Sequence, residues 1–439
     1  MPDHATSADA AVQAQLDRLW ALSPGADVLG LERITRLLAR LGNPERRLPP
    51  VFHVAGTNGK GSTCAFLRAA LEAAGYRVHV YSSPHLARFN ERIRVAGQLI
   101  EDVALAPLLR EVLDEADGIG ASFFEVTTAA AFLHFARTPA DACVIEVGLG
   151  GRLDATNVIP APAVCGIAAL GIDHQAFLGD ALVQIAAEKA GIAKPGVPLV
   201  TMEYPAEIAG VITQAAGRAG APVHAAGRTW RYEVENGRVS VTDENGTIGL
   251  PQPALAGAHQ AANLALAAAM LRRQRALDIP LRAMEAAATS ARWPARLQKL
   301  SPGPLVDRLP PERRRHGVWL DGAHNEQAAT AIACGWAQGG PAALVIGMLA
   351  NKDANAVLRH LMTGSCEVVA VPVPGHAHHL PATLVEQALR HGAVTAQPAE
   401  SVEAAFDLLA DHGRCEAVLI AGSLYLAGGV LVANDELPT

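Results

Sequence analysis

A glycine-rich segment with one lysine is the part of this chain best suited to chemistry. The β-prone run 51–55 leads into residues 56–62, and a helix-compatible stretch follows. Glycines let the backbone approach an anion closely, and the exposed N–H groups and dipole of a helix N-terminus favour phosphate there. Lys60 adds a positive charge for the outer phosphates. We therefore predict a nucleoside-triphosphate site, although Gly61 separates Lys60 from Ser62, whereas the common P-loop pattern has serine or threonine directly after the lysine.

A second candidate is an acid at the end of another apolar run. The run Cys143–Ile145 leads to Glu146, and the glycine-rich segment 147–151 comes next. A carboxylate at the end of a core strand beside a phosphate loop is well placed to hold Mg²⁺, directly or through water. The alternative is a solvated residue at a strand end. The glycines favour the functional interpretation, because they let a ligand or another backbone approach.

Two more apolar runs end near groups that could bind a metal ion. Ser83 follows the run 77–81 and offers a hydroxyl, although serine before proline is more often a cap or turn residue. His174 follows the run 163–169, with Asp173 either as its orienting acid or as an acid on the phosphate side. A lone histidine is more often structural, so both interpretations are kept for each residue.

Other charged or titratable residues have plainer explanations. Glu188 and Lys189 are adjacent on a helical pattern, which predicts a solvated charged face. A lysine beside a metal site would be repelled unless it were neutralised or modified. His376, His378 and His379 have no partner set at metal-ligand spacing, so we favour a surface loop over a metal cluster.

The second half of the chain repeats the order of a strand followed by a polar loop. Asp321 and His324 stand at the end of the run 317–321, and the polar segment 422–425 follows the run 417–421. Ligands of open α/β sheets bind beyond the carboxyl ends of the strands. We therefore expect two sheets that present polar loops to one interdomain cleft.

The order of elements predicts an α/β fold. Strand-like runs alternate with helical patterns, so we expect mostly parallel sheets with helices on both faces. We also expect two helices within 11–42, hairpins at the Asn-Gly pairs of 229–249, and a helix over 259–273. Trp293-Pro294 marks the boundary between expected domains 1–292 and 293–439. The strand-like runs are 51–55, 77–81, 142–147 and 163–169 in the first domain, and 317–321, 342–347, 367–373 and 417–421 in the second.

Composition limits the class of protein. The chain has 439 residues, which favours two domains, and its formal net charge of −7 argues against a general nucleic-acid binder. We find no apolar run of membrane-spanning length, and the first residues lack the pattern of a secretory signal. The six cysteines form no C-x-x-C pair, which favours a reducing cytoplasm.

Taken together, these segments resemble the folylpolyglutamate synthase/dihydrofolate synthase family within the Mur ligase superfamily. Each is modest alone, but their order and their spread over most of the chain make coincidence a poor explanation. The glycine inserted after Lys60 is the family's own form of the phosphate loop. The matching segments are 56–62, 82–86 with 89–93, 124–129, 146–157, 173–179, 188–192, 259–263, 293–297, 321–325 and 422–425.

The resemblance implies a fold and a reaction. The fold is a P-loop-type, mostly parallel sheet domain followed by a smaller Rossmann-like α/β domain, the glutamate-ligase domain, with the active site in the interdomain cleft. The reaction joins L-glutamate to dihydropteroate, to a folate, or to both. ATP phosphorylates the carboxylate of the acid, the amine of glutamate attacks the acyl phosphate, and phosphate leaves. The resemblance further implies Mg²⁺ and a cytoplasmic monomer with no nucleic-acid or membrane partner.

The resemblance also implies roles for the matching residues. Lys60, His174 and Lys189 serve catalysis, and Lys189 matches a lysine that many members carry as a carbamate able to bind a second Mg²⁺. Ser83, Glu146 and His174 match metal ligands. The residues that match substrate contacts are Phe124, Arg152 and Asp154 for the pterin acid, and Thr57, Asn58, Gly59, Lys60, Gly61, Ser62, Asn263, Arg296, Asp321 and His324 for ATP.

The chain departs from the family pattern in two places, and rival functions exist. Histidines fill the loop 375–379, where members often have arginine, and Ala295 stands where glycine is common. The segment 150–154 resembles members that also accept dihydropteroate, so we expect both synthase activities. The alternatives are a folylpolyglutamate synthase only, another Mur-type ligase, and a nucleotide-dependent binding module. A cell-wall ligase would need a uridine-nucleotide domain before Val51, where about fifty residues leave too little room.

Overall fold

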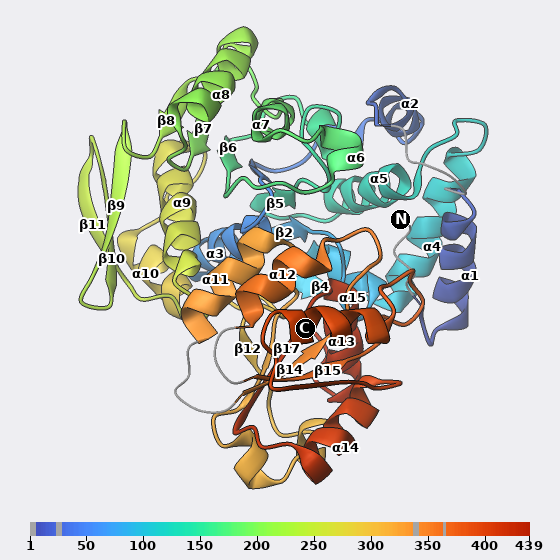
Figure 1. Cartoon of the computed structure of the whole chain (residues 1–439). Coiled ribbons are helices and arrows are strands. Elements are labelled where there is room, and N and C mark those ends of the chain that lie inside the picture. The colour runs from blue at the N-terminus through green and yellow to red at the C-terminus, as the bar shows by residue number, and fades with distance from the viewer. Residues whose placement is uncertain (1–5, 23–28, 337–341, 363–365) are drawn as a thin grey trace. The chain divides into compact units, whose positions relative to one another are not determined.

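The computed structural model describes residues 6–22, 29–336, 342–362 and 366–439 (Figure 1). Its contacts divide the chain into two compact units. Unit 1 comprises Met1–Ala254 and Gln260–Arg292, and unit 2 comprises Leu255–His259 and Trp293–Thr439. Each unit has its own main sheet and its own buried apolar clusters.

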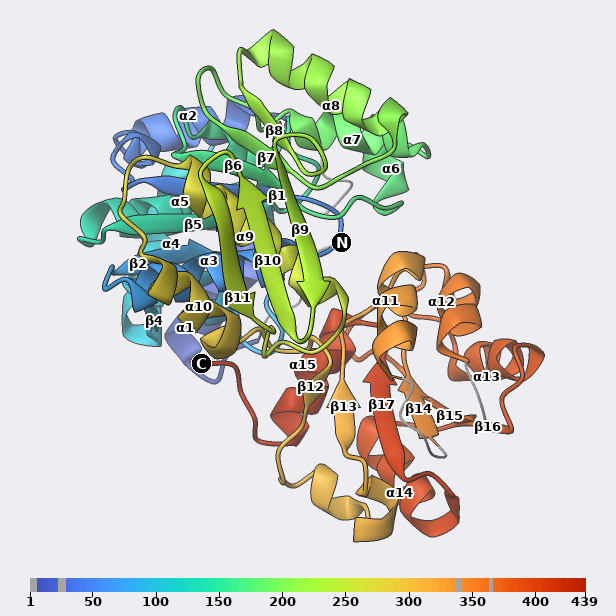
Figure 2. The same ribbon diagram turned by 90° about the vertical axis from the view of Figure 1, so that its left-hand side faces the viewer.

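Unit 1 is built on an eight-stranded sheet that is mostly parallel, as the sequence predicts (Figure 2). Only β3 and β4, at one edge, run antiparallel to their neighbours. Four short strands of this sheet, each of two or three residues, were not among the predicted runs: β3, β4, β7 and β8. In spatial order the strands are β4 (Gln98–Leu99), β3 (Ile93–Val95), β2 (Val78–Tyr81), β5 (Ala142–Glu146), β1 (Val51–Ala55), β6 (Val164–Ile167), β7 (Leu199–Thr201) and β8 (Val223–Ala225).

The central strand β1 explains why the predicted site residues come from distant parts of the chain. All five of its residues are buried, as an apolar run between two parallel neighbours requires. Val54 pairs with Glu146 on β5 and with Gly166 on β6. The carboxyl ends of the three strands therefore meet at one edge, where the phosphate loop and the loops after β5 and β6 begin.

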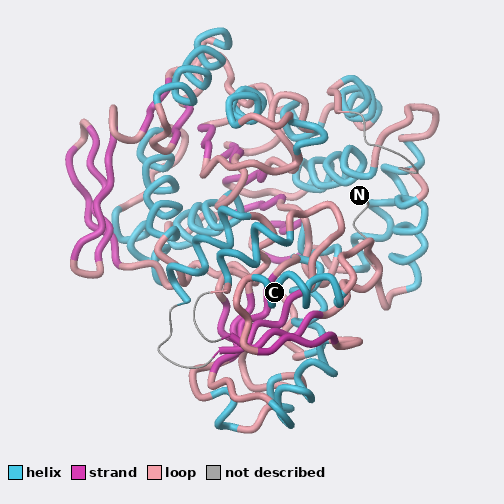
Figure 3. Tube along the Cα trace, viewed as in Figure 1, coloured by secondary structure: helices cyan, strands magenta, loops and turns pink. Residues whose placement is uncertain are grey.

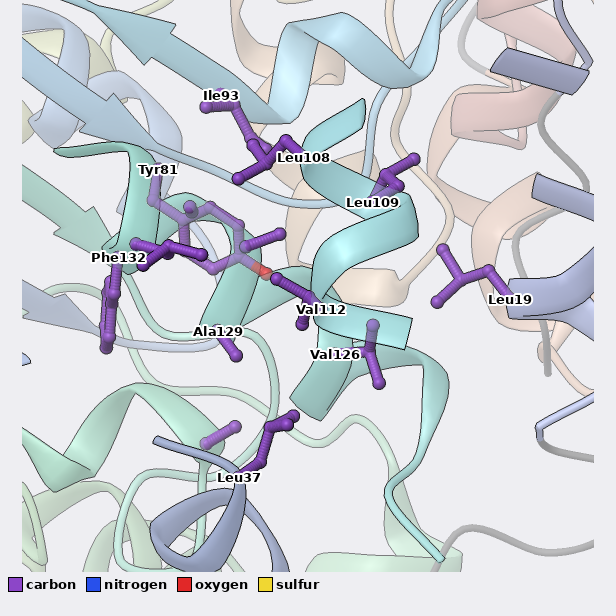
Figure 4. Close-up of a cluster of buried hydrophobic side chains, with 14 of the residues drawn as sticks. Leu19, Leu37, Tyr81, Ile93, Leu108, Leu109, Val112, Val126, Ala129 and Phe132 are labelled. Atoms are coloured by element: carbon purple, nitrogen blue, oxygen red, sulfur yellow. The ribbon is translucent and has the colours of Figure 1, made fainter. Parts of the chain in front are cut away.

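Helices of unit 1 pack against the sheet and form two buried apolar clusters with it. In one cluster, Leu19, Leu37, Val112 and Phe132, from four different helices, pack with Tyr81 of β2 (Figure 4). The other cluster joins helices α7 (Leu182–Ala190) and α8 (Ala206–Ala219) to β6 and β7. The helices are α1 (Ala10–Trp20), α2 (Glu32–Arg40), α3 (Lys60–Ala73), α4 (Asp102–Glu115), α5 (Phe123–Arg137), α6 (Gln175–Leu178), α7 (Leu182–Ala190), α8 (Ala206–Ala219), α9 (His259–Arg273) and α10 (Leu281–Ser290).

The predicted hairpins form a separate three-stranded antiparallel sheet, seen apart from the main sheet in Figure 3. Its strands are β9 (Trp230–Glu235), β10 (Arg238–Asp243) and β11 (Gly246–Pro251). Asn236 and Gly237 both have positive φ, at 50° and 70°. That pair of angles is the one a tight two-residue hairpin turn needs, which confirms the reading of the first Asn-Gly pair.

Unit 2 is built on a six-stranded sheet, parallel except for its edge strand β12. The run 367–373 was predicted too long: β15 ends at Ala370, ahead of Pro372 and Pro374, which have no N–H to donate. In spatial order the strands are β12 (Gln298–Lys299), β13 (Val318–Leu320), β17 (Ala417–Ala421), β14 (Ala342–Ile346), β15 (Cys366–Ala370) and β16 (Thr395–Pro398). The helices are α11 (Glu326–Trp336), α12 (Ala354–Leu361), α13 (Pro381–Arg390), α14 (Val402–His412) and α15 (Leu424–Ala433).

Over the residues that the structure describes, every helix is too short or too polar to cross a membrane.

Candidate active site

The phosphate loop has the backbone form that its glycines allow. Gly59 lies in the left-handed region with φ +82°, and α3 begins at the next residue, Lys60. A Cβ at Gly59 would overlap the side-chain oxygen of Asn263 on α9. Two of the predicted ATP residues, 204 positions apart in sequence, therefore touch in the folded chain, and glycine is needed both for the turn and for the close approach.

Lys60 turns back over its own loop toward Glu146. Its Nζ donates to the carbonyl of Thr57 at 3.3 Å and lies 3.9 Å from Oε1 of Glu146. Both side chains are mostly buried, with 16% of Lys60 and 6% of Glu146 exposed. The structure thus places an ammonium and a carboxylate together at the N-terminus of a helix, which is the arrangement expected around a metal–triphosphate.

The loop after β6 holds the phosphate loop in place. The N–H groups of Thr57 and Asn58 donate to the carbonyl of Ala169 at 2.8 and 3.1 Å, and Thr57 Oγ1 donates to the carbonyl of Gly171 at 3.0 Å. This loop continues to His174, so the phosphate loop is bonded to the segment that carries one of the predicted metal ligands.

The three predicted metal ligands lie at or after the ends of β2, β5 and β6, and the phosphate-loop strand β1 lies between β5 and β6 in the sheet. Glu146 ends β5, Ser83 lies in the turn after β2, and His174 follows β6 in a left-handed conformation with φ 54°. Across the described residues, no group of three or more His, Cys, Asp or Glu could hold a metal ion. A serine hydroxyl and one buried carboxylate, with further places left to water and phosphate, nevertheless fit the oxygen-rich coordination that Mg²⁺ prefers.

Lys189 is buried, so the expectation of a solvated charged face was wrong for this residue. It is 4% exposed, and its Nζ donates to the carbonyl of Gly56 at 2.9 Å. Burial, and then repulsion from Lys60, lowers the pKa of Lys189 to about 7, against the attraction of Asp173 and Asp154. An amine of this kind is available as a neutral nucleophile near neutral pH.

The lowered pKa of Lys189 predicts how stability changes with pH. Below about pH 7 both the folded and the unfolded chain carry the proton, so the full cost of burying the charge is present. From about pH 7 up to the ordinary value of 10.5, the unfolded chain binds the proton more tightly than the folded chain. The free energy of unfolding of the wild type should therefore rise with pH in this window, relative to that of Lys189→Met.

Urea unfolding of both proteins in buffer free of carbon dioxide checks this prediction. The difference between the wild type and Lys189→Met isolates Lys189 from other titrating groups. A difference that stays constant across the window would contradict a buried, neutral Lys189.

The three residues expected to bind the pterin acid lie around the loop after β5. A Cβ at Gly148 would overlap the ring of Phe124, which itself lies 6.0 Å from the ring of Tyr81. Arg152 donates to Glu188 Oε1 through Nε and Nη2, at 3.0 and 2.8 Å, and remains half exposed. The pairing of Arg152 with Glu188 was not predicted, because 36 residues separate them in sequence.

Asp154 is buried and binds the loop itself. Its carboxylate accepts hydrogen bonds from the N–H of Leu149, at 2.8 Å, and from the N–H of Thr156, at 3.0 Å. Burial raises the pKa of Asp154, and the hydrogen bonds oppose that shift. The residue therefore fixes the loop on which Phe124 packs, whatever further contact it makes with a substrate.

In unit 2, the three residues expected to contact ATP come together at the end of β13. The buried carboxylate of Asp321 accepts from the N–H groups of Leu297 and Ala323, each at 2.8 Å. Burial raises the pKa of Asp321 and the charge of Arg296 opposes that shift. His324 Nδ1 lies 2.9 Å from the carbonyl of Gly322, so Nδ1 carries the proton.

Ala295, the departure from the family's glycine, has a left-handed backbone with φ 54°. A left-handed conformation costs a residue with a Cβ about 1–2 kcal/mol. Ala295→Gly should therefore raise the free energy of unfolding of unit 2 by roughly 0.5–1 kcal/mol, after the larger chain entropy of glycine is subtracted. Denaturant unfolding measures this change.

The control for Ala295→Gly is Ala427→Gly, a second buried alanine in unit 2 but inside α15. Glycine there should lower stability by about 1 kcal/mol. Equal destabilisation by both changes would contradict the strain at Ala295.

The histidine side chains of the loop 375–379 donate hydrogen bonds to backbone carbonyls. His376 stacks on Tyr425 with ring centroids 3.9 Å apart, and its Nδ1 lies 3.0 Å from the carbonyl of Pro374. His378 Nδ1 bonds the carbonyl of His376 at 2.7 Å, and His379 Nε2 bonds that of Lys352 at 2.9 Å. These contacts agree with the preference for a loop over a metal cluster.

Comparison with known proteins identifies the family. The dihydrofolate synthase/folylpolyglutamate synthase of Escherichia coli (strain K12) is 35% identical to this chain over 412 residues, which are 93% of this chain and 92% of that protein. The chain belongs to the folylpolyglutamate synthase/dihydrofolate synthase family. A model of the dihydrofolate synthetase C-terminal domain also matches residues 307–433. As a family member, the chain is an ATP-dependent glutamate ligase.

Solved structures of the family agree with both sheets. The E. coli FolC in complex with DHPP and ADP has a TM-score of 0.86 at 33% identity, covering 97% of each chain. A bifunctional folylpolyglutamate synthase/dihydrofolate synthase with Mn, AMPPNP and L-glutamate bound has a TM-score of 0.83 at 32% identity, covering 98% of this chain and 99% of that chain. The predicted α/β fold, a mostly parallel sheet domain followed by a smaller α/β domain, is therefore the architecture of the family.

Proposed function

We propose that this chain adds L-glutamate both to dihydropteroate and to folates. The observation that carries the proposal is Lys60, held at the start of α3 between the Thr57 carbonyl and Glu146, in a chain that matches bifunctional relatives over most of its length. ATP and a divalent metal ion are the cofactors that such a reaction needs, and we propose Mg²⁺ as the metal.

The chemistry follows from the poor reactivity of a carboxylate. Transfer of the γ-phosphoryl group of ATP to the acid gives an acyl phosphate, and the amine of glutamate then forms the amide while phosphate leaves. The phosphate loop holds the triphosphate, and Lys60 offsets the charge that develops on the transferred group. Glu146, Ser83 and His174 would hold the metal ion, which neutralises phosphate charge when bound.

The site residues of unit 2 are proposed to contact the nucleotide. Arg296, Asp321 and His324 form one cluster, in which the Asp321 carboxylate orders the backbone that carries Arg296. Asn263 is proposed to contact ATP from unit 1, because its amide lies against Gly59.

Lys189 is proposed to carry a carbamate. Its neutral amine would attack carbon dioxide, so that an N–C bond forms and the amine loses a proton. The resulting anion suits a second Mg²⁺, as the resemblance implies. Activity should then rise on adding bicarbonate to carbon-dioxide-free enzyme, and Lys189→Met should show no such response. An identical bicarbonate response in both proteins would contradict the modification.

We propose a cytoplasmic monomer that acts on small molecules, and light scattering of the pure protein tests the monomer. The test of bifunctionality is to offer dihydropteroate or a reduced folate separately with ATP, Mg²⁺ and glutamate, and to identify products by mass. Product from both acids supports the proposal, and product from the folate alone would leave a folylpolyglutamate synthase only.

A further inference from the structure

A buried histidine lies on β1, the strand that leads into the phosphate loop, and no step of the proposed reaction uses it. His53 is the middle residue of β1, wholly buried between Ile145 of β5 and Cys165 of β6. Burial, followed by the charge of Lys194, lowers the pKa of His53 to about 3, so the ring is neutral. In an apolar strand this residue could be a simple core side chain, but its hydrogen bonds connect it to the loop after β5.

His53 is the first member of a chain of hydrogen bonds. Its Nε2 lies 2.9 Å from Thr156 Oγ1, and Thr156 Oγ1 donates to Asp154 Oδ1 at 2.5 Å. The other oxygen of Asp154 accepts from the N–H of Leu149 at 2.8 Å. Strand β1 is thereby connected, through two side chains, to the loop between Glu146 and Arg152.

The direction of each hydrogen bond is fixed by its neighbours. The ionised Asp154 carboxylate has no proton to donate and accepts from the N–H groups of Leu149 and Thr156, so the single proton of the Thr156 hydroxyl is donated to it. Thr156 Oγ1 must then accept from His53, which puts the imidazole proton on Nε2. His53 Nδ1 is left buried without a hydrogen-bond partner. That orphaned nitrogen is destabilising, so His53 is not the side chain that packing alone would favour.

We propose that His53 is a positioning residue for the acid substrate, acting through Thr156 and Asp154 on the loop 147–151. The inference rests on the proposed function, because the pterin acid is expected to bind next to this loop. The His53 donor holds the Thr156 hydroxyl in the rotamer that reaches Asp154. Asp154 in turn holds the N–H of Leu149 and hence the packing of Gly148 against Phe124.

Two conservative variants separate positioning from core packing. The side-chain nitrogen of His53→Gln can reach the place of Nε2 and donate to Thr156, whereas His53→Asn is polar but too short. We expect His53→Asn to raise the KM for dihydropteroate about tenfold, the factor that one lost hydrogen bond is worth, with the KM for ATP changed less than about twofold. His53→Gln should recover most of the affinity. Thr156→Val should behave as His53→Asn does.

Different outcomes would contradict the positioning role of His53 and the proposed ligase function. Equal rises in both KM values, or an unchanged KM for dihydropteroate in His53→Asn with only a lower melting temperature, would overturn the positioning role. If the wild type forms product with neither acid, the proposed function fails. The hydrogen-bonded chain from His53 through Thr156 and Asp154 to Leu149, called the relay here, is then tested by hydrogen exchange. The amide of Leu149 should then exchange faster in His53→Asn than in the wild type and His53→Gln, and equal rates in all three proteins would overturn the relay.

Discussion

Lys60→Ala should abolish glutamate-dependent ADP formation while leaving the fold intact. The Lys60 ammonium stands at the start of α3, next to the Thr57 carbonyl and Glu146, where the triphosphate is proposed to bind. Loss of one such preorganised charge costs about a hundredfold to a thousandfold in kcat. A coupled assay of ADP release, with and without glutamate, measures the effect.

Arg68→Ala is the matched control for this change. Arg68 lies on the same helix, paired with Glu72, and has no part in the proposed chemistry. It should keep wild-type turnover and a similar melting temperature. Retained turnover in Lys60→Ala would refute the role of the phosphate loop, whereas loss of turnover in both variants would point to damage to α3.

Glu146→Ala should raise the Mg²⁺ concentration required for half-maximal activity by at least about tenfold, the factor that corresponds to 1.4 kcal/mol of binding energy. The buried Glu146 carboxylate is the one charged group among the three proposed ligands, so its removal should weaken metal binding more than that of Ser83 or His174. A titration of initial rate against Mg²⁺ at saturating ATP measures this shift.

The control must separate metal binding from the loss of a negative charge in unit 1. Glu72→Ala removes a carboxylate near the far end of α3 and should leave the Mg²⁺ titration unchanged. An unchanged titration in Glu146→Ala would count against metal ligation and would leave Glu146 as a partner of Lys60 only.

Residue patterns predicted the elements that carry the site because each is locally encoded. The phosphate loop was visible because glycine, lysine and the start of a helix are adjacent in sequence, and β1, α3 and α9 form as expected. Asn263 was reached only through the resemblance, since nothing local shows that α9 places it against Gly59.

What could not be predicted depends on contacts between distant segments. Lys189 sits next to the half-buried Glu188, and only the donation of Lys189 to Gly56, 133 residues away, shows that the lysine is held in the interior. Arg152 has its partner on α7, and His53 was passed over because a histidine within an apolar run gives no local signal of the hydrogen bonds it makes. The spacing of apolar residues shows which face of a helix or strand is buried, but it does not show which other element that face packs against.

The most direct test of the central claim follows oxygen atoms through the reaction. Dihydropteroate with isotope-labelled carboxylate oxygens is incubated with the pure protein, ATP, Mg²⁺ and glutamate, and both products are analysed by mass spectrometry. The account predicts an acid extended by one glutamate residue, one labelled oxygen transferred to inorganic phosphate, and the other retained in the new amide. An extended acid with unlabelled phosphate, or phosphate released without any extended acid, would contradict it.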